Sequence, residues 1–168
     1  MKKSTTSWFA IYTAPRAEKK VFQRLESVGY IVYLPLLSTV KQWSDRKKKV
    51  EIPLISSYVF VKIELLGLSK LRGVPGVVGV LKYLGKPAAV KEVEINNLKI
   101  LVREQQHVKV LTDIQIPKGT PIQVINGQMK GVIGELVHYK GKVKVIVRVE
   151  ACATLVEVEV PLSFVEKI

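Results

Sequence analysis

The residues best suited to chemistry lie in the stretch QWSDRKKKVEIPLISSYVFVKI, residues 42–63. Four consecutive cations, Arg46 to Lys49, precede a run that alternates aromatic and aliphatic side chains. Cations at nucleic-acid phosphates release counterions and make binding depend on salt. Surface aromatic side chains often supply the energetic centre of a protein interface. The stretch therefore favours binding over bond-making chemistry, with a solvated hairpin tip as the alternative reading of the cations.

Catalytic patterns are weak in this sequence. Ser44 and Lys47 have the Ser-x-x-Lys spacing of some acyl-transfer enzymes, but the companion motifs of those enzymes are missing. There is no glycine-rich phosphate loop. The single cysteine, Cys152, cannot form an internal disulfide, and with two histidines, His107 and His138, a metal site is not expected. We expect no enzyme activity, no cofactor and no metal, and the cysteine usage fits a reducing cytoplasm.

The net charge of +13 suggests a polyanionic partner such as DNA, RNA or anionic lipid, with simple solubility as the alternative. Residues 1–64 hold 12 Lys/Arg against 5 Asp/Glu, whereas residues 117–168 hold 7 against 5. A polyanion should therefore meet the first half. Lys2-Lys3 precede an apolar run too short for a signal peptide, and no run reaches the length of a membrane span.

The first half has a mixed α+β pattern that would position these residues. Residues 8–14 predict a strand, Pro15 suits a first helical position, and Gly29 suits a helix C-cap. Between them, apolar residues recur on one helical face and cations on the opposite face, with Arg24 at its edge: Ala17, Val21, Leu25 and Val28 against Arg16, Lys19 and Lys20. We further expect strands at 31–34, 57–63 and 76–84, a hairpin arm at 41–49, and helices at 65–73 and 92–102.

The strand at residues 57–63 has two chemically different faces. Strand side chains alternate, so Tyr58, Phe60 and Lys62 share one face and branched aliphatic residues share the other. If this strand pairs with residues 8–14, Tyr12 joins Tyr58 and Phe60 on the face away from the helices. The three rings would then form either an exposed binding surface or a patch covered by another segment. Trp43 could stack on a base, although bracing the hairpin is the favoured interpretation.

The pattern of apolar residues changes in the second half of the chain. Residues 103–116 have a weak pattern, and we interpret them as a linker. From Pro117 onward, short strands are separated by glycine and lysine turns. This spacing is typical of a small all-β barrel. We therefore expect an α+β sheet backed by helices, followed by the barrel, with strands at 121–125, 132–139, 142–149 and 155–160.

Several motifs together resemble NusG-family transcription elongation factors, which carry an amino-terminal (NGN) domain and a KOW domain. The pattern WFAIYTAPRAEKK…YLPL…QWSDRKKK…PLISSYVFVKI resembles the NGN domain, most closely in specialised paralogues of the UpxY type that act on capsular polysaccharide operons. Residues 118–137 are similar to a KOW motif, whose residues here are Lys118, Gly119, Val124, Gly127, Met129 and Gly134. The implied domains are NGN at 1–103, a linker at 104–116 and KOW at 117–168.

The resemblance implies a mechanism. The NGN domain would bind the clamp helices of the largest RNA polymerase subunit, reduce pausing and termination, and contact non-template DNA or nascent RNA. The residues implied for polymerase are Tyr12, Ile55, Tyr58, Phe60 and Tyr83. Those implied for nucleic acid are Arg16, Lys20, Arg24, Arg46, Lys47, Lys48, Lys49 and Arg72. We expect a cytoplasmic monomer, away from membranes, whose KOW domain recruits a partner, with a ribosomal protein as one candidate.

Two departures from the general family pattern bear on these expectations. Ser56-Ser57-Tyr58 stands where general members have Pro-Gly-Tyr, and Glu150 stands where an aromatic residue contacts Rho or a ribosomal protein. Rho or ribosome binding by this part is therefore in doubt. Some specialised relatives refold the KOW domain as a helical hairpin, but the valine alternation at 142–149 favours a barrel here. The alternatives are a general NusG-like factor and a KOW-containing RNA-binding or ribosome-associated protein.

Overall fold

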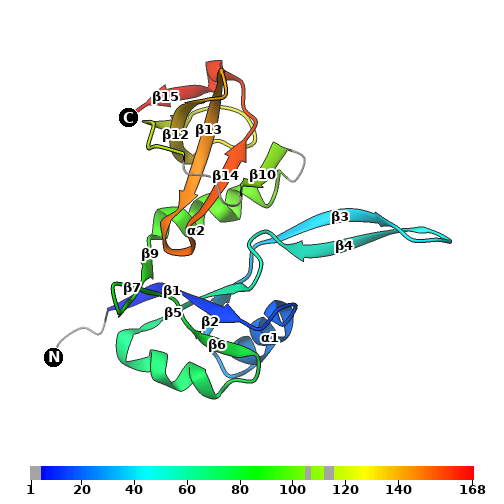
Figure 1. The fold of residues 1–168 in the computed structure, drawn as a ribbon, viewed down its shortest axis with the longest axis vertical. Coiled ribbons are helices and arrows are strands. Elements are labelled where there is room, and N and C mark those ends of the chain that lie inside the picture. Colours follow the sequence, from blue (N-terminus) through cyan, green and yellow to red (C-terminus); the bar gives the residue numbers. More distant parts are fainter. Residues whose placement is uncertain (1–4, 105–106, 112–115) are drawn as a thin grey trace. The chain divides into compact units, whose positions relative to one another are not determined.

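A computed structural model describes residues 5–104, 107–111 and 116–168 (Figure 1). The chain divides into two compact units, one of residues 1–35 and 55–92, and one of residues 36–54 and 93–168. The first is a mixed α+β unit, and the second holds a β-hairpin, a helix and an antiparallel sheet, so the predicted fold class is confirmed. Within the described ranges, no helix is long and apolar enough to cross a membrane.

The first unit is built on an antiparallel sheet in the order β2-β5-β1-β6, with β9 also pairing with β1. Its strands are β1 (Thr6–Thr13), β2 (Ile31–Tyr33), β5 (Tyr58–Glu64), β6 (Val77–Val80) and β9 (Ala89–Val90). The pairing of β1 with β5, which the sequence reading assumed, is confirmed and runs from Thr6 opposite Glu64 to Tyr12 opposite Tyr58. Because β5 lies between β1 and β2, it is a central strand whose side chains have neighbours on both flanks.

Helix α1 (Glu18–Ser27) lies against β2 and β5, and its apolar face buries Val21 and Leu25 completely. Gly29 follows it with φ +91°, as expected for a glycine that ends a helix. The prediction that Pro15 opens the helix was wrong. Pro15 and Arg16 form a turn in which Arg16 has φ +63°, a left-handed conformation that a continuous helix excludes.

The remaining elements of the first unit are short. The predicted helix after β5 is confirmed as a 3₁₀ helix, η1 (Leu65–Gly73). The single strand expected at 76–84 is interrupted: β6 is followed by β7 (Lys82–Tyr83), which turns at Leu84-Gly85 into β8 (Lys86–Pro87). The break falls at Leu81, where the chain passes from pairing with β1 to pairing with β8: the Leu81 N–H donates to the Ala10 carbonyl and the Leu81 carbonyl accepts from the Ala88 N–H, both at 2.9 Å.

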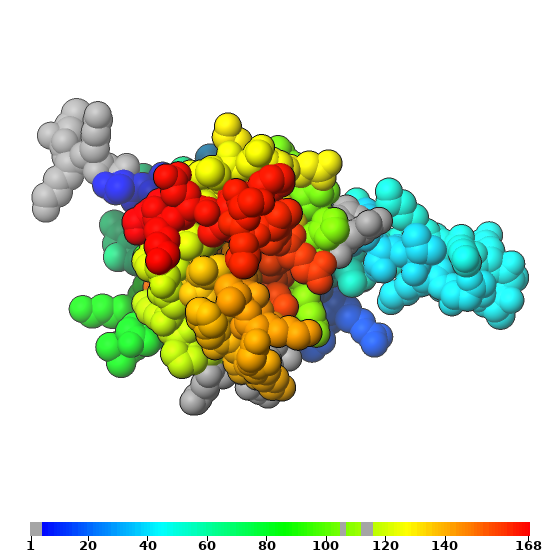
Figure 2. All heavy atoms as spheres, turned by 90° about the horizontal axis from the view of Figure 1, so that it is seen from above, coloured from blue at the N-terminus to red at the C-terminus, as the bar shows by residue number. Residues whose placement is uncertain are grey.

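The basic segment forms the predicted hairpin. Strands β3 (Leu36–Gln42) and β4 (Lys47–Pro53) pair in continuous antiparallel register, from Leu36 opposite Pro53 to Gln42 opposite Lys47. The turn is closed by the Trp43 backbone N–H, which donates to the Arg46 carbonyl at 2.7 Å. Figure 2 shows the segment in cyan as an elongated arm.

The second unit also contains α2 and a six-stranded antiparallel sheet in the order β10-β14-β13-β12-β11-β15. The elements are α2 (Glu92–Leu101), β10 (Val108–Leu111), β11 (Thr120–Val124), β12 (Ile133–Tyr139), β13 (Lys142–Val149), η3 (Glu150–Cys152), β14 (Thr154–Val158), η4 (Leu162–Phe164) and β15 (Val165–Lys167). Each face of the sheet carries its own apolar cluster, because Val145 and Val147 point into one and Ile146 into the other. The predicted all-β segment is confirmed.

Two features of this unit differ from the sequence reading. The segment interpreted as a linker contains β10, which pairs with β14 as an edge strand; the rest of that segment lies partly outside the described residues. Helix α2 is bonded to the sheet: the Asn97 amide donates to the Ile133 carbonyl at 2.7 Å and accepts its N–H at 3.0 Å. Leu101 joins the apolar cluster of the sheet. The two compact units separate after Glu92.

Candidate binding surfaces

One face of the first unit's sheet carries a group of rings that we call the aromatic face: Trp8, Tyr12, Tyr33, Tyr58 and Phe60. Their common side follows from the strand registers, which place Tyr12 opposite Tyr58 and Tyr33 opposite Phe60. The Tyr12 and Tyr58 rings lie 5.5 Å apart at 57°, and the Tyr33 and Phe60 rings lie 6.4 Å apart at 29°. These separations and tilts are those that favour aromatic pairs. The predicted sharing of one face by Tyr12, Tyr58 and Phe60 is confirmed.

The aromatic face is only partly accessible, so its residues divide between the two alternatives that the sequence left open. Phe60 is completely buried and Ile55 is 4% exposed, so neither belongs to an exposed patch. Phe60 sits on a central strand between Tyr33 and Ala10, and these neighbours enclose its ring from both flanks. Tyr12 is 41% exposed and Tyr58 is half-buried, and together they form the accessible part of the face. Tyr83, in the β7–β8 hairpin, is 72% exposed.

A polar cluster borders the aromatic face at Trp8, and sequence reasoning did not assign it. The Trp8 indole Nε1–H donates to Glu92 Oε2 at 3.0 Å, and Lys62 Nζ pairs with the same oxygen at 3.2 Å. Lys62 also lies 5.7 Å from the centre of the Trp8 ring, a cation–π distance. The alternation that places Lys62 beside Tyr58 and Phe60 could have indicated its side of the sheet, but nothing in the sequence pointed to Glu92.

The predicted basic stripe of α1 is brought together only in part. Arg16 and Lys20 are exposed. Arg24 Nη1 donates to the Pro75 carbonyl at 2.6 Å, so its guanidinium also stabilises the turn before β6. Arg72, at the end of η1, is exposed. Of the predicted cations in the first unit, Arg16, Lys20 and Arg72 are exposed and make no ion pair with another described residue, whereas Arg24 also has a positioning role.

The hairpin presents its cations without neutralising partners. The side chains of Lys41, Arg46, Lys47, Lys48 and Lys49 are all exposed, and none of the five makes an ion pair with any other described residue. Lys41 stands directly opposite Lys48. Like charges in such a pair destabilise a sheet. A surface that retains this repulsion is suited to a polyanion, because the polyanion removes it.

Trp43 lies at the turn of the hairpin with 55% of its surface exposed. Its backbone N–H closes the turn, and its carbonyl accepts the Gln42 side-chain amide at 3.0 Å. The backbone of Trp43 therefore stabilises the hairpin while much of the indole remains accessible. Both readings of this residue, bracing and contact, have support in its geometry.

In the segment that resembles a KOW motif, residues 118–137, two glycines are required by close packing and one by a turn. A side chain at Gly119 would overlap the Leu136 carbonyl, and one at Gly134 would lie 2.7 Å from the Ile146 carbonyl. Gly127 has φ +76° in the loop after β11. Val124 and Met129 are core residues of the sheet, so their role here is packing. Lys118 Nζ pairs with Glu150 at 3.1 Å, which ties the start of the motif to η3.

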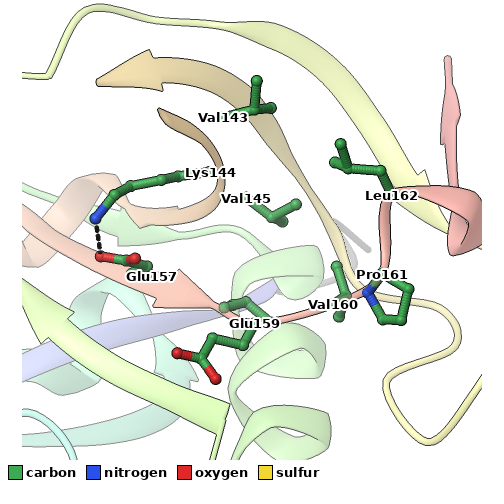
Figure 3. Close-up of a pocket in the computed structure, with 9 residues that line it drawn as sticks. Val143, Lys144, Val145, Glu157, Glu159, Val160, Pro161 and Leu162 are labelled. Atoms are coloured by element: carbon green, nitrogen blue, oxygen red, sulfur yellow. Dashed lines mark hydrogen bonds and ion pairs between the residues drawn. The ribbon is translucent and has the colours of Figure 1, made fainter. Parts of the chain in front are cut away.

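A shallow groove on the second unit's sheet is lined by the start of β13, the end of β14 and the segment that follows β14 (Figure 3). Val143 and Leu162 are exposed at its apolar rim, and Val160 and Pro161 lie beside them. Its charged side is occupied by the Lys144–Glu157 ion pair at 2.7 Å, drawn as a dashed line in Figure 3. Such a groove can bind an apolar side chain of a partner, and its paired charges are not arranged for acid–base catalysis.

The reactive groups singled out in the sequence do not converge. Burial, with a smaller contribution from the charge of Glu94, raises the pKa of Cys152 from 9.0 to about 12, so its thiol stays protonated and unreactive. His107 Nδ1 lies 3.6 Å from Glu159 at an exposed site. Among the described residues, no cluster of His, Cys, Asp and Glu could hold a metal ion.

Comparison with known proteins gives consistent matches along the chain. The family model described as "Transcription termination factor nusG" matches residues 6–99. The chain is similar to the transcription termination/antitermination protein NusG of Rickettsia felis, at 26% identity over 172 residues covering 92% of this chain and 88% of that protein. The NusG of Rickettsia bellii is also 26% identical, over 179 residues covering 98% and 90%. A solved structure of Thermotoga maritima NusG shares the fold, with a TM-score of 0.53, 22% identity and 98% coverage of both chains.

Proposed function

Because this chain belongs to the NusG family of transcription termination factors, we propose that it is an operon-specific elongation and antitermination factor that binds RNA polymerase. Its resemblance to specialised paralogues of the UpxY type supports the operon-specific role. The observation that carries the proposal is the accessible Tyr12–Tyr58 pair on the aromatic face. Exposed, mutually packed tyrosines present large apolar area at low entropic cost, which is typical of interface hot spots.

The proposed polymerase contact uses two layers of residues. Tyr12, Tyr58 and Tyr83 would touch the clamp helices of the largest polymerase subunit, because each has accessible ring surface. Ile55 and Phe60 are buried, so they would support this surface without forming its outer part. The five predicted polymerase-binding residues therefore divide into three that would contact the polymerase and two that would support them from the core.

The proposed nucleic-acid contact uses exposed cations that make no ion pair with any residue the structure describes. Arg16, Lys20 and Arg72 are exposed on the first unit, and Arg46 to Lys49 are exposed on the hairpin. Cations at phosphates supply affinity without reading sequence. Arg24 would contribute less, because it also holds the Pro75 carbonyl.

The second unit is proposed to recruit a partner through its KOW-like sheet. The apolar rim at Val143 and Leu162 is suited to a protein side chain. Glu150 pairs with Lys118 where general relatives carry an aromatic anchor, so a ribosomal protein or Rho would bind here without that anchor. We keep the NGN domain at 1–103 and the KOW domain at 117–168 as proposals about function.

The test is in vitro transcription with the cognate polymerase, on templates that carry a pause and a terminator. We expect fewer pauses and more readthrough with this protein than without it. Tyr12→Ala with Tyr58→Ala should weaken polymerase binding by about 2–4 kcal/mol. Tyr30→Ala is the matched control, a half-buried tyrosine outside the aromatic face. No effect on any template, including the protein's own operon leader, would refute the proposal and favour an RNA-binding or ribosome-associated protein.

A further inference from the structure

The cations of the β3–β4 hairpin are divided between its two faces. Alternation and register place Lys47 and Lys49 on one face, and Lys41 and Lys48 on the other. All four are exposed. A ribbon that lay flat on a polyanion, such as a membrane surface, would use one face and leave the other unpaired. The lysines of both faces can be neutralised together only by a partner whose negative charges lie on both sides of the hairpin.

We propose that the hairpin enters the major groove of duplex DNA tip first, with one lysine pair facing each phosphate wall. Stacked sheets lie about 10 Å apart, which approximates the thickness of one sheet with its packed side chains. The major groove of B-form DNA is about 12 Å wide and admits a two-stranded ribbon, whereas the minor groove is about 6 Å wide and does not. The inference rests on the proposed function only for the choice of DNA as the polyanion.

The length of the charged part also matches the groove. The four lysines lie in the three residue pairs nearest the turn, Gln42–Lys47, Lys41–Lys48 and Val40–Lys49. The distance from the first of these pairs to the third is two steps, roughly 7 Å at about 3.4 Å per residue. The groove is about 8.5 Å deep. Two pairs farther from the turn, Glu51 stands opposite Ser38, so an acidic side chain appears only where the ribbon would leave the groove.

The turn would then reach the floor of the groove, where base edges are exposed. It carries Ser44, Asp45 and Arg46, all exposed. Asp45 is the one acidic residue among residues 40–49. It lies in the turn, so in the proposed arrangement its carboxylate is the group farthest from the phosphates on the two sides of the groove. A carboxylate can accept from the cytosine amino group, and an arginine can bind guanine in a bidentate manner. The turn therefore supplies the sequence-reading contacts, and the lysines supply affinity.

Other nucleic acids fit this geometry less well. A single strand offers one line of phosphates, which one face of the ribbon would satisfy. Double-stranded RNA has a deep and narrow major groove that side chains cannot enter. B-form DNA is the form whose phosphates line both sides of a space of the ribbon's thickness.

The first test measures binding of the full chain to a short mixed-sequence DNA duplex by fluorescence anisotropy across a salt series. Two variants remove one face each: Lys47→Gln with Lys49→Gln, and Lys41→Gln with Lys48→Gln. Each should lower affinity by about tenfold or more and reduce the salt slope by about 1.8, the value for two phosphate contacts. The control, Lys130→Gln with Lys142→Gln, removes two exposed lysines outside the hairpin, one in the turn before β12 and one at the start of β13. If only one of the two double variants lowers the affinity for duplex DNA, the proposal is refuted.

The second test identifies the groove and the nucleic acid. Duplex DNA with glucosylated hydroxymethylcytosine has a blocked major groove at unchanged phosphate charge, and it should bind at least about tenfold more weakly. Saturating the minor groove with netropsin should change nothing. Equal binding to glucosylated DNA, or equal or tighter binding to single-stranded DNA, an RNA duplex or anionic vesicles, would overturn the inference.

The two proposals fail separately. These measurements contain no polymerase, so readthrough without two-faced duplex binding would refute only the groove insertion. Duplex binding without any effect on transcription would refute only the elongation-factor role. Asp45→Asn and Arg46→Ala should shift preference among duplex sequences. If both variants keep the sequence preference of the wild type, the turn does not contact base edges in a sequence-specific way.

Discussion

Phe60→Ala separates the folding role of the aromatic face from its binding role. Phe60 is completely buried on the central strand β5 and stacks on Tyr33. Removing a fully buried phenylalanine ring leaves a cavity and costs about 3–5 kcal/mol of unfolding free energy. Tyr58 is half-buried, so Tyr58→Ala should cost only about 0.8–1.5 kcal/mol, roughly half the transfer free energy of a fully buried aromatic side chain and without a closed cavity.

The assay follows urea unfolding of the first unit through the fluorescence of Trp8, which is 4% exposed. A Trp43→Phe background removes the second tryptophan, whose indole is largely exposed on the hairpin. With a urea dependence of about 2 kcal/mol/M, Phe60→Ala should lower the unfolding midpoint by about 1.5–2.5 M. A loss below about 1 kcal/mol would show that Phe60 is accessible, and the division between an outer tyrosine pair and a buried support would be refuted.

Three further outcomes follow from the second unit. Asn97→Ala leaves the Ile133 N–H and carbonyl without their side-chain partner, so the unfolding free energy should fall by about 2–4 kcal/mol in chemical denaturation. Gly119→Ala forces a side chain onto the Leu136 carbonyl and should cost about 1–3 kcal/mol in thermal unfolding. The pKa of Cys152 is raised from 9.0 to about 12, so at pH 8 the folded thiol should react with iodoacetamide about a thousandfold more slowly than the unfolded one. Because the folded state holds that proton longer, stability should fall as pH rises from 9 toward 12. Equal labelling rates in buffer and in urea, or wild-type stability of either substitution, would contradict these contacts.

Much of the first unit could be predicted because its patterns are local. Alternation in β1 and β5 placed Tyr12 and Tyr58 on one face, and the strand register confirms it. The helical spacing of Val21 and Leu25 predicted the buried face of α1. Alternation predicts on which face of the sheet a side chain lies, but it does not predict which other residues cover that face. For that reason the burial of Phe60 could not be predicted from the sequence.

The features that the sequence did not predict depend on contacts between residues far apart in the chain. β10 is a four-residue edge strand whose existence depends on β14, nearly fifty residues later in the chain. Helix α2 shows an apolar side in the sequence, but only its contacts reveal that Asn97 and Leu101 bind the C-terminal sheet. The left-handed turn at Arg16 displaces the start of α1 past Pro15, although Pro15 alone favours a helix start. Helix α2 itself was predicted correctly, and it is β10 whose weak local pattern was overridden by pairing with β14.

The lysines of the hairpin also have a consequence for the protein's solubility. Within the described part of the chain, β3 and β4 pair only with each other, so both outer edges of the ribbon present unpaired backbone groups. Such edges are templates for strand addition by a second molecule, which leads to aggregation. Four exposed lysines on two faces make two approaching ribbons repel each other. The charge that would hold DNA thus also keeps copies of this protein apart when no DNA is bound.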